Sequence, residues 1–92
     1  MDIMSNYFVY MATCADGTIY TGYTKNLIER IEKHNAGHGA RYTKLHRPIR
    51  LSYTEIFSSQ KEAMKREREL KKLSRGEKLL LINNFKGIIN NQ

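Results

Sequence analysis

The sequence predicts one small α+β domain, with three strands and three helices in the order β-β-α-β-α-α. Two observations predict it: runs of aromatic and β-branched residues surround an Asp-Gly turn signal, and three Asn/Ser and Glu pairs have the spacing of helix capping boxes. The chain has 92 residues, of which 40% are hydrophobic. A chain this short has room for a single core.

The first two strands are expected to form an antiparallel hairpin. Residues 7–13 and residues 19–23 are rich in tyrosine, valine, isoleucine and threonine, which favour strands. Between them lies Asp16-Gly17, a dipeptide that favours a tight turn.

The first helix is expected to start after Asn26 as N-cap, with Glu29 completing a capping box, and to run to about Asn35. Ala36-Gly37 then ends it. Residues 49–57 follow as a third strand, whose imperfect alternation predicts a bulge near its end. Because a helix connects the second and third strands, a parallel or mixed sheet is expected.

Two further capping boxes open the last two helices. Ser59 with Glu62 predicts a helix to about Leu73, and Ser74 with Glu77 predicts another that ends between Ile82 and Phe85. We therefore expect the domain to occupy residues 6–82, with residues 83–92 as a C-terminal tail, of which residues 90–92 have nothing to bury.

The charge balance favours a polyanionic partner. The chain carries 16 Lys and Arg against 9 Asp and Glu, and neutralising phosphates with such cations releases condensed counterions. The stretch from residue 37 to residue 50 holds no acid and reads as a loop, so its cations are the predicted nucleic-acid contacts, although a merely solvated surface is the alternative. These cations are Arg41, Lys44, Arg47 and Arg50. The run from Lys61 to Lys78 mixes eight cations with four glutamates and reads as a solvated helix surface.

Several classes of protein are disfavoured. The sequence contains neither an apolar run of about 20 residues, which a membrane span needs, nor the pattern of a secretion signal. A single cysteine, Cys14, can form no internal disulfide and no zinc-thiolate cluster. We therefore expect a cytoplasmic protein with no membrane association.

Glu67 is the most informative single residue. Steps of 100° along the predicted helix place it between Ala63 and Met64 on one side and Leu70 on the other, within the apolar face. An unpaired buried charge costs several kcal/mol, so Glu67 needs a salt bridge to an arginine, a raised pKa or a bound cation. From the wheel alone, a structural ion pair is the default interpretation.

Arg30 and His34 stand four residues apart on the first helix, at the edge of its apolar stripe, and could reach one substrate together. Packing roles are the default for both. His38 lies four residues after His34, but Gly37 should end the helix first, and no third metal ligand is near. Among the tyrosines, Tyr20 stands out because Gly22 follows it and would let a backbone or a substrate approach closely.

In combination these motifs resemble the GIY-YIG nuclease domain, and the small single-domain bacterial branch of that family in particular, over residues 6–82. The residues that carry the resemblance are Phe8-Val9-Tyr10, the run Tyr20-Thr21-Gly22-Tyr23-Thr24-Lys25-Asn26-Leu27, and then Arg30, His34 and Glu67. The resemblance implies the GIY-YIG fold, with a three-stranded mixed sheet flanked by helices.

It also implies an endonuclease that hydrolyses DNA phosphodiester bonds with one divalent ion, Mg²⁺ or Mn²⁺, held by Glu67. Tyr20, close to Tyr10, would take the proton of the attacking water, helped by nearby cations that favour the phenolate. Arg30 would stabilise the phosphate, and His34 would relay the proton or hold the phosphate. We expect structure-selective or weakly sequence-specific cleavage in DNA repair or processing.

Two alternatives from other classes stay open. The first is a catalytically weak or inactive nucleic-acid-binding module, supported by Tyr23, where excision-repair relatives have lysine, and by the absence of a clear match for a late asparagine of some relatives. The second is an adaptor whose basic loop meets an acidic protein. The set of Tyr10, Tyr20, Arg30, His34 and Glu67 argues against both, because a mere binding protein has no use for a buried, unpaired carboxylate.

Overall fold

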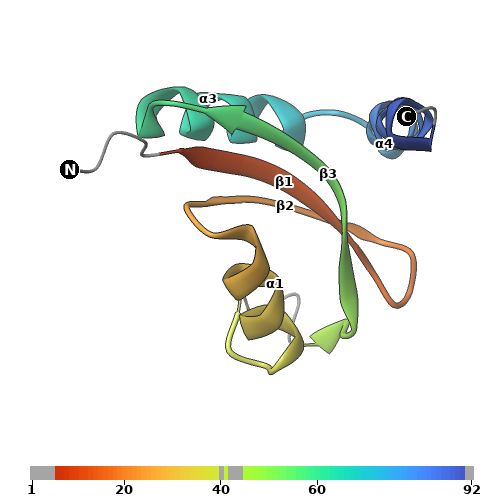
Figure 1. Cartoon of the computed structure of the whole chain (residues 1–92). Helices are drawn as coiled ribbons and strands as arrows, with labels where there is room; N and C mark the ends of the chain where they lie inside the picture. Colours follow the sequence, from red (N-terminus) through yellow and green to blue (C-terminus); the bar gives the residue numbers. More distant parts are fainter. Residues whose placement is uncertain (1–5, 40, 42–44, 91–92) are drawn as a thin grey trace.

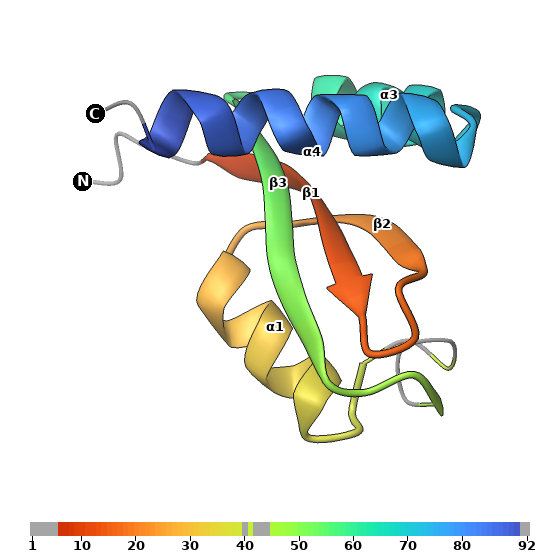
Figure 2. The same cartoon turned by 90° about the vertical axis from the view of Figure 1, so that its right-hand side faces the viewer.

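The computed structural model describes residues 6–39, 41 and 45–90 and confirms the α+β class and the order of the elements. The strands are β1 (Tyr7–Cys14), β2 (Ile19–Thr24) and β3 (Ile49–Phe57), and the helices are α1 (Leu27–Asn35), α3 (Gln60–Lys71) and α4 (Arg75–Asn90). As Figures 1 and 2 both show, α1 lies on one side of the sheet and α3 and α4 on the other.

The sheet is antiparallel throughout, so the expectation of a mixed sheet is wrong. Its strand order is β2-β1-β3, and β1 pairs antiparallel with both neighbours. The crossover through α1 does give β2 and β3 the same direction, as expected. However, it passes over β1, and the two strands never pair with each other.

The predicted bulge is present, but in another part of β3. The register between β1 and β3 shifts where Met11 faces Tyr53 and Ala12 faces Leu51, so that Ser52 is the extra residue. The irregularity therefore lies in the first half of β3 and not near its end. The hydroxyl of Ser52 is hydrogen-bonded to that of Thr13 across the two strands.

Alternate residues of β1 supply the core on both sides of the sheet. Tyr10, Ala12 and Cys14 pack with Ile49 and, from α1, with Leu27 and Ile31. On the other side, Val9 packs with Ala63 and Leu70 of α3, which are all fully buried. β1 is thus the central strand, and β2 is left as an edge strand.

All three capping boxes begin helices where they were expected. The Asn26 side chain accepts a hydrogen bond from the Glu29 amide, and Ser59 accepts one from the Glu62 amide. At Ser74 both hydrogen bonds of the box form, since Glu77 also accepts from the Ser74 amide at 2.8 Å.

The last helix is longer than the sequence suggested. α4 continues to Asn90, and the Phe85 ring lies 5.3 Å from the Tyr53 ring of β3. The expected tail is therefore helical from residue 83 to residue 90. Within the part of the chain that the structure describes, no helix is long and apolar enough to cross a membrane.

Candidate active site

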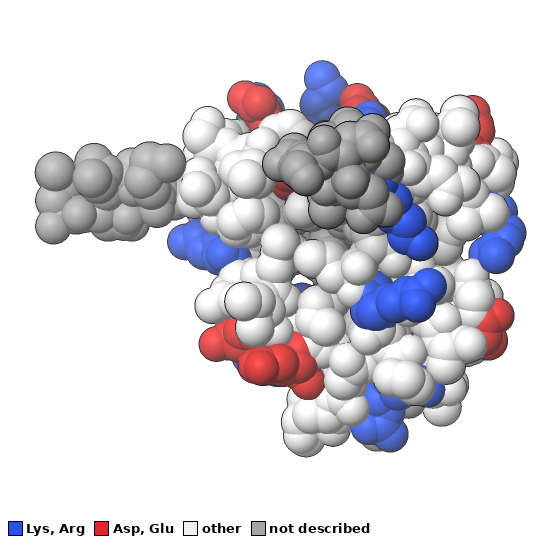
Figure 3. All heavy atoms as spheres, turned by 45° about the vertical axis from the view of Figure 1, so that its right-hand side comes forward, with Lys and Arg blue, Asp and Glu red and all other residues white. Residues whose placement is uncertain are grey.

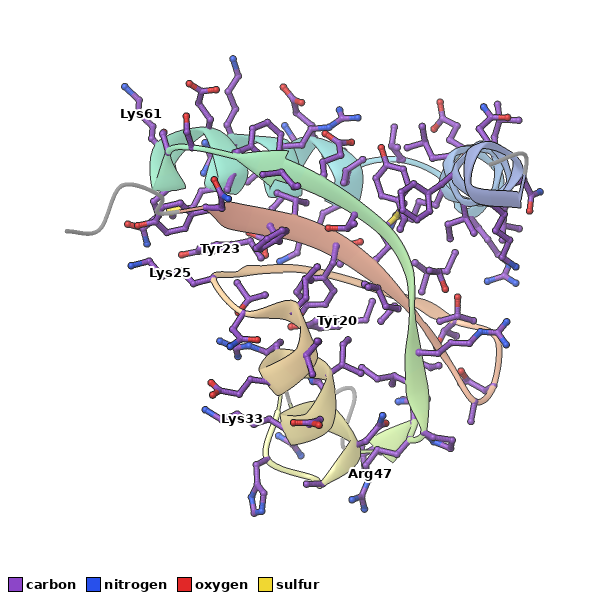
Figure 4. The ribbon with its side chains drawn as sticks, in the orientation of Figure 1. Tyr20, Tyr23, Lys25, Lys33, Arg47 and Lys61 are labelled. Atoms are coloured by element: carbon purple, nitrogen blue, oxygen red, sulfur yellow. The ribbon has the colours of Figure 1, made fainter. Side chains whose placement is uncertain are left out.

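A cleft of about 630 Å³ opens at the β2 edge of the sheet and is lined by residues from both strands of the hairpin, from α1 and from α3. Four of the five residues predicted to carry chemistry line it, together with Gly22, and these four are Tyr10, Tyr20, Arg30 and Glu67. Figure 4 shows Tyr20 on the α1 side of the sheet and Tyr23 closer to α3. The cleft therefore joins the two sides of the sheet around its free edge.

Glu67 enters this cleft from α3. Its side chain is 17% exposed, between the fully buried Ala63 and Leu70, as the helical wheel predicted. Its carboxylate is not unpaired, because the Lys71 ammonium lies 3.5 Å away. The partner is therefore a lysine one turn further along α3, whose side chain is 54% exposed, and not the arginine that was expected.

An ion-pair network connects α3 to β3. Arg66 donates from Nε to the Glu55 carboxylate of β3 at 3.1 Å and from Nη1 to Glu69 at 3.2 Å. Holding Arg66 against β3 directs the next residue, Glu67, around the helix toward the cleft.

His34 lies behind the cleft and does not line it. It is 1% exposed, its Nε2 lies 3.0 Å from the Tyr10 hydroxyl oxygen, and its ring meets the Tyr20 ring edge-on at 5.3 Å. Burial, with a contribution from the Arg30 charge, lowers the pKa of His34, while burial and Tyr20 raise the pKa of Tyr10. The pair is thus a neutral imidazole hydrogen-bonded to a protonated phenol, and Tyr10 is unsuited to act as a base.

The His34 environment predicts a pH-dependent stability. Because the pKa of His34 in the folded protein lies below its ordinary value of 6.5, the unfolded chain binds the extra proton first. This contribution to stability is present above the unfolded pKa and is lost as the pH falls through the folded pKa. We expect the melting temperature to fall between about pH 7.5 and about pH 5, and the fall to be smaller in His34→Gln.

Thermal unfolding followed by circular dichroism at both pH values tests this. The matched control is His38→Gln, because His38 is exposed and its loss should leave the wild-type pH dependence in place. An equal fall in wild type and His34→Gln would show that other groups, and not His34, cause it.

The absence of a side chain at Gly22 makes room for the Tyr10 side chain. Tyr10 and Gly22 are directly paired across β1 and β2, and a Cβ on Gly22 would lie 2.8 Å from the Tyr10 hydroxyl oxygen. The glycine therefore lets the Tyr10 ring lie across β2 and reach His34. The close approach that the sequence predicted at this position is thus made by a side chain of the protein.

Arg30 is an exposed residue of α1 that lines the cleft. Its positive charge contributes to the lowered pKa of His34 and partly opposes the rise in the pKa of Tyr10, so it acts electrostatically on both buried rings. A guanidinium in this position is suited to stabilise negative charge that develops on a phosphate.

The predicted basic contact loop does not line the cleft in the part that is described. Lys44 lies outside the described residues. Arg41 and Arg50 are exposed, and Arg47 donates from Nη1 to the Asn35 carbonyl at 3.3 Å. Figure 4 shows Arg47 at the opposite end of α1 from Lys25. On the face drawn in Figure 3, basic side chains run down the right of centre, with acidic ones mostly toward the edges.

Sequence reasoning missed the residues at the mouth of the cleft. The Lys25 ammonium lies 5.2 Å from the centre of the Tyr7 ring, and Gln60 donates to the Tyr23 hydroxyl at 3.3 Å. The available signal was the hairpin register, since Tyr23 pairs with Val9 and therefore lies close to Tyr7.

The donor set of the cleft fits one hard divalent cation held in part by substrate. Among the described residues there is no group of three His, Cys, Asp or Glu side chains that could hold a metal alone. Mg²⁺ commonly binds through one or two carboxylates, with water and phosphate completing its octahedron. Glu67 supplies such a carboxylate, whereas Glu29, the other acid in the cleft, is exposed and pairs with Lys33 at 3.7 Å.

Known proteins of one family are similar to this chain. The family model described as the GIY-YIG catalytic domain matches residues 6–79. A UPF0213 protein of Staphylococcus aureus strain Mu3 is 51% identical over 79 residues, which are 86% of this chain and 96% of that protein.

Two solution NMR structures are also similar. The UPF0213 protein BH0048 of Bacillus halodurans is 47% identical with a TM-score of 0.55, over 85% of this chain and 83% of that one. The protein EF2693 of E. faecalis is 36% identical with a TM-score of 0.60, over 94% and 92% of the two chains. This chain therefore belongs to the GIY-YIG nuclease family, and within it to the small bacterial UPF0213 proteins.

Proposed function

We propose that this chain is a cytoplasmic, metal-dependent endonuclease that hydrolyses DNA phosphodiester bonds, with structure-selective or weakly sequence-specific cleavage, in DNA repair or processing. The observation that carries the proposal is that Tyr20, Arg30 and Glu67, which come from three different elements, line one cleft. A nucleophile activator, a guanidinium and a hard anionic ligand are the groups that phosphodiester hydrolysis needs at one phosphate.

In this proposal Tyr20 accepts the proton of the attacking water. Tyr10 is held protonated by its burial and Arg30 lies in the same cleft, so Tyr20 is the tyrosine better suited to the task. The edge-to-face contact between the His34 and Tyr20 rings, and the hydrogen bond between the His34 ring and the Tyr10 hydroxyl, fix the position of the Tyr20 phenol. His34 is therefore a positioning residue, because it does not line the cleft.

Arg30 would bind the non-bridging oxygens of the scissile phosphate and stabilise the charge that builds up on them. Glu67 would hold one Mg²⁺ or Mn²⁺ ion together with the phosphate. When bound, such an ion polarises the phosphate and stabilises the leaving oxygen.

A second candidate function is a nucleic-acid-binding module with weak or no catalysis. The observation that favours it is the ion pair between Glu67 and Lys71, which already neutralises the carboxylate without any metal. Under this alternative the protein binds polynucleotides with a steep salt dependence and leaves them intact.

A cleavage assay distinguishes the two functions. Labelled duplex, single-stranded and branched DNA are each incubated with the protein in Mg²⁺, in Mn²⁺ and in EDTA. We expect cleavage of at least one substrate with metal and none in EDTA, with binding recorded in parallel by fluorescence anisotropy. Salt-sensitive binding of all three substrates without any cleavage would instead support the binding module.

A further inference from the structure

A second cavity, of about 290 Å³, adjoins the candidate active site along β2. It is lined by Ile19, Tyr20, Thr21, Lys71 and Lys78. Tyr20 lines both this cavity and the cleft, and Lys71 connects them through its ion pair with Glu67. A polynucleotide strand that crosses the β2 edge at Tyr20 would therefore pass directly from the cleft into the second cavity.

The chemistry of this cavity suits a single anion. Two of its five lining residues are lysines, from the ends of α3 and α4 that meet beside β2, and none is acidic. Lys78 is only partly exposed, so its position there is not that of a freely solvated surface cation. A lysine ammonium acts as a flexible point charge and a donor to phosphate.

Thr21 gives an independent sign of a missing ligand. Its side chain is 4% exposed, and its hydroxyl oxygen is buried without a hydrogen-bond partner within the part of the chain that is described. Buried hydroxyl groups are nearly always hydrogen-bonded in folded proteins. An anion in the adjoining cavity would accept a hydrogen bond from this hydroxyl.

We propose that this cavity is a phosphate subsite, which binds a backbone phosphate of the polynucleotide beside the phosphate that is cleaved. Lys78 and Lys71 neutralise the phosphate there, and Thr21 donates to it. The inference rests on the proposed function, because it takes the strand that reaches Tyr20 as its starting point. It places a phosphate contact where the end of α3 meets the start of α4, apart from the basic loop.

Lys71 also couples the subsite to the metal. Without metal its ammonium neutralises Glu67 at 3.5 Å. A divalent cation on Glu67 repels this ammonium, which can then turn to the phosphate in the neighbouring cavity. Metal and polynucleotide therefore favour each other's binding, and by linkage this coupling is reciprocal.

The subsite is tested by binding of fluorescein-labelled DNA in EDTA, over a series of salt concentrations, for wild type, Lys78→Met and the control Lys72→Met. Lys72 is exposed, follows α3 directly and lines neither cavity. In Lys78→Met, the loss of one phosphate contact should reduce the steepness of the slope of log affinity against log salt concentration by about 0.7 to 0.9. Binding at low salt should weaken several-fold. Lys72→Met should retain the wild-type slope.

The coupling is tested on the free protein by Mn²⁺ titration followed by electron paramagnetic resonance. Lys71→Met removes the competing cation and should tighten Mn²⁺ binding by roughly fivefold, the lower end of typical coupling between sites. Lys72→Met should leave Mn²⁺ binding unchanged. Unchanged or weaker Mn²⁺ binding by Lys71→Met would overturn the coupling.

The subsite and the nuclease activity can fail separately. If wild type cleaves DNA but Lys78→Met and Lys72→Met have the same salt slope, the subsite is wrong and the nuclease stands. If wild type binds without cleaving and Lys78→Met flattens the slope, the subsite stands on a protein that is not a nuclease. If wild type does not bind DNA at all, the subsite is overturned.

Discussion

Replacing Glu67 with glutamine is expected to slow DNA cleavage by on the order of 10³-fold, because a bound metal ion contributes several kcal/mol to charge stabilisation. Glutamine keeps the shape of the side chain but removes the negative charge that a hard cation needs. DNA binding in EDTA should be at least as tight as that of wild type, since the change removes a negative charge and releases the Lys71 ammonium from its ion pair. Single-turnover cleavage in Mg²⁺, with anisotropy in EDTA, measures both effects.

Glu62→Gln is the matched control for this variant. Glu62 lies on the same helix and is exposed outside the cleft, and glutamine at its position still permits a capping box with Ser59. It should therefore cleave like wild type. If Glu67→Gln also cleaved like wild type, the carboxylate would hold no essential ion, and its role would be reduced to the ion pair with Lys71.

The sequence predicted the elements of the fold better than their arrangement. Hairpin, caps and strand periodicity are local properties, and the boundaries of α1 and β3 followed from them. The order of the strands is not local: the crossover through α1 permits β3 to pair with either strand of the hairpin, and packing decides. The helix α4 extends to Asn90, and the ring contact of Phe85 with Tyr53 on β3 joins its second half to the sheet, a long-range contact that local sequence does not show.

The candidate site was predictable where it depended on a single helix or hairpin. The wheel placed Glu67 on the buried face because Ala63 and Leu70 define that face. It could not choose between partners, since Lys71 reaches Glu67 through a side-chain conformation that periodicity does not set. The contact between Tyr10 and Gly22 was available in principle, because the two residues lie equally far from Asp16 in a hairpin that turns there.

Gly22→Ala is expected to destabilise the protein by about 1–3 kcal/mol, the usual cost of adding a methyl group to a filled space. The new Cβ would lie 2.8 Å from the Tyr10 hydroxyl oxygen and 3.0 Å from the ring carbon that carries it, so the ring has to move. Moving it breaks the hydrogen bond to His34 and displaces the aromatic group that positions Tyr20. We therefore expect cleavage to fall by about 10²-fold as well, the size of effect that a small misplacement at an active site can have.

Measuring both the thermal unfolding of Gly22→Ala and its cleavage of DNA shows whether the glycine makes room for Tyr10 or for the substrate. Gly76→Ala is the control, because a Cβ there meets nothing closer than the Ser74 hydroxyl at 4.0 Å, and alanine in α4 should be neutral or stabilise by up to about 1 kcal/mol. If Gly22→Ala melts like wild type yet fails to cleave, the space above Gly22 belongs to the substrate and not to Tyr10. If both properties fall, and Tyr10→Phe restores part of the stability of Gly22→Ala by removing the crowded hydroxyl, the glycine is there to admit the tyrosine.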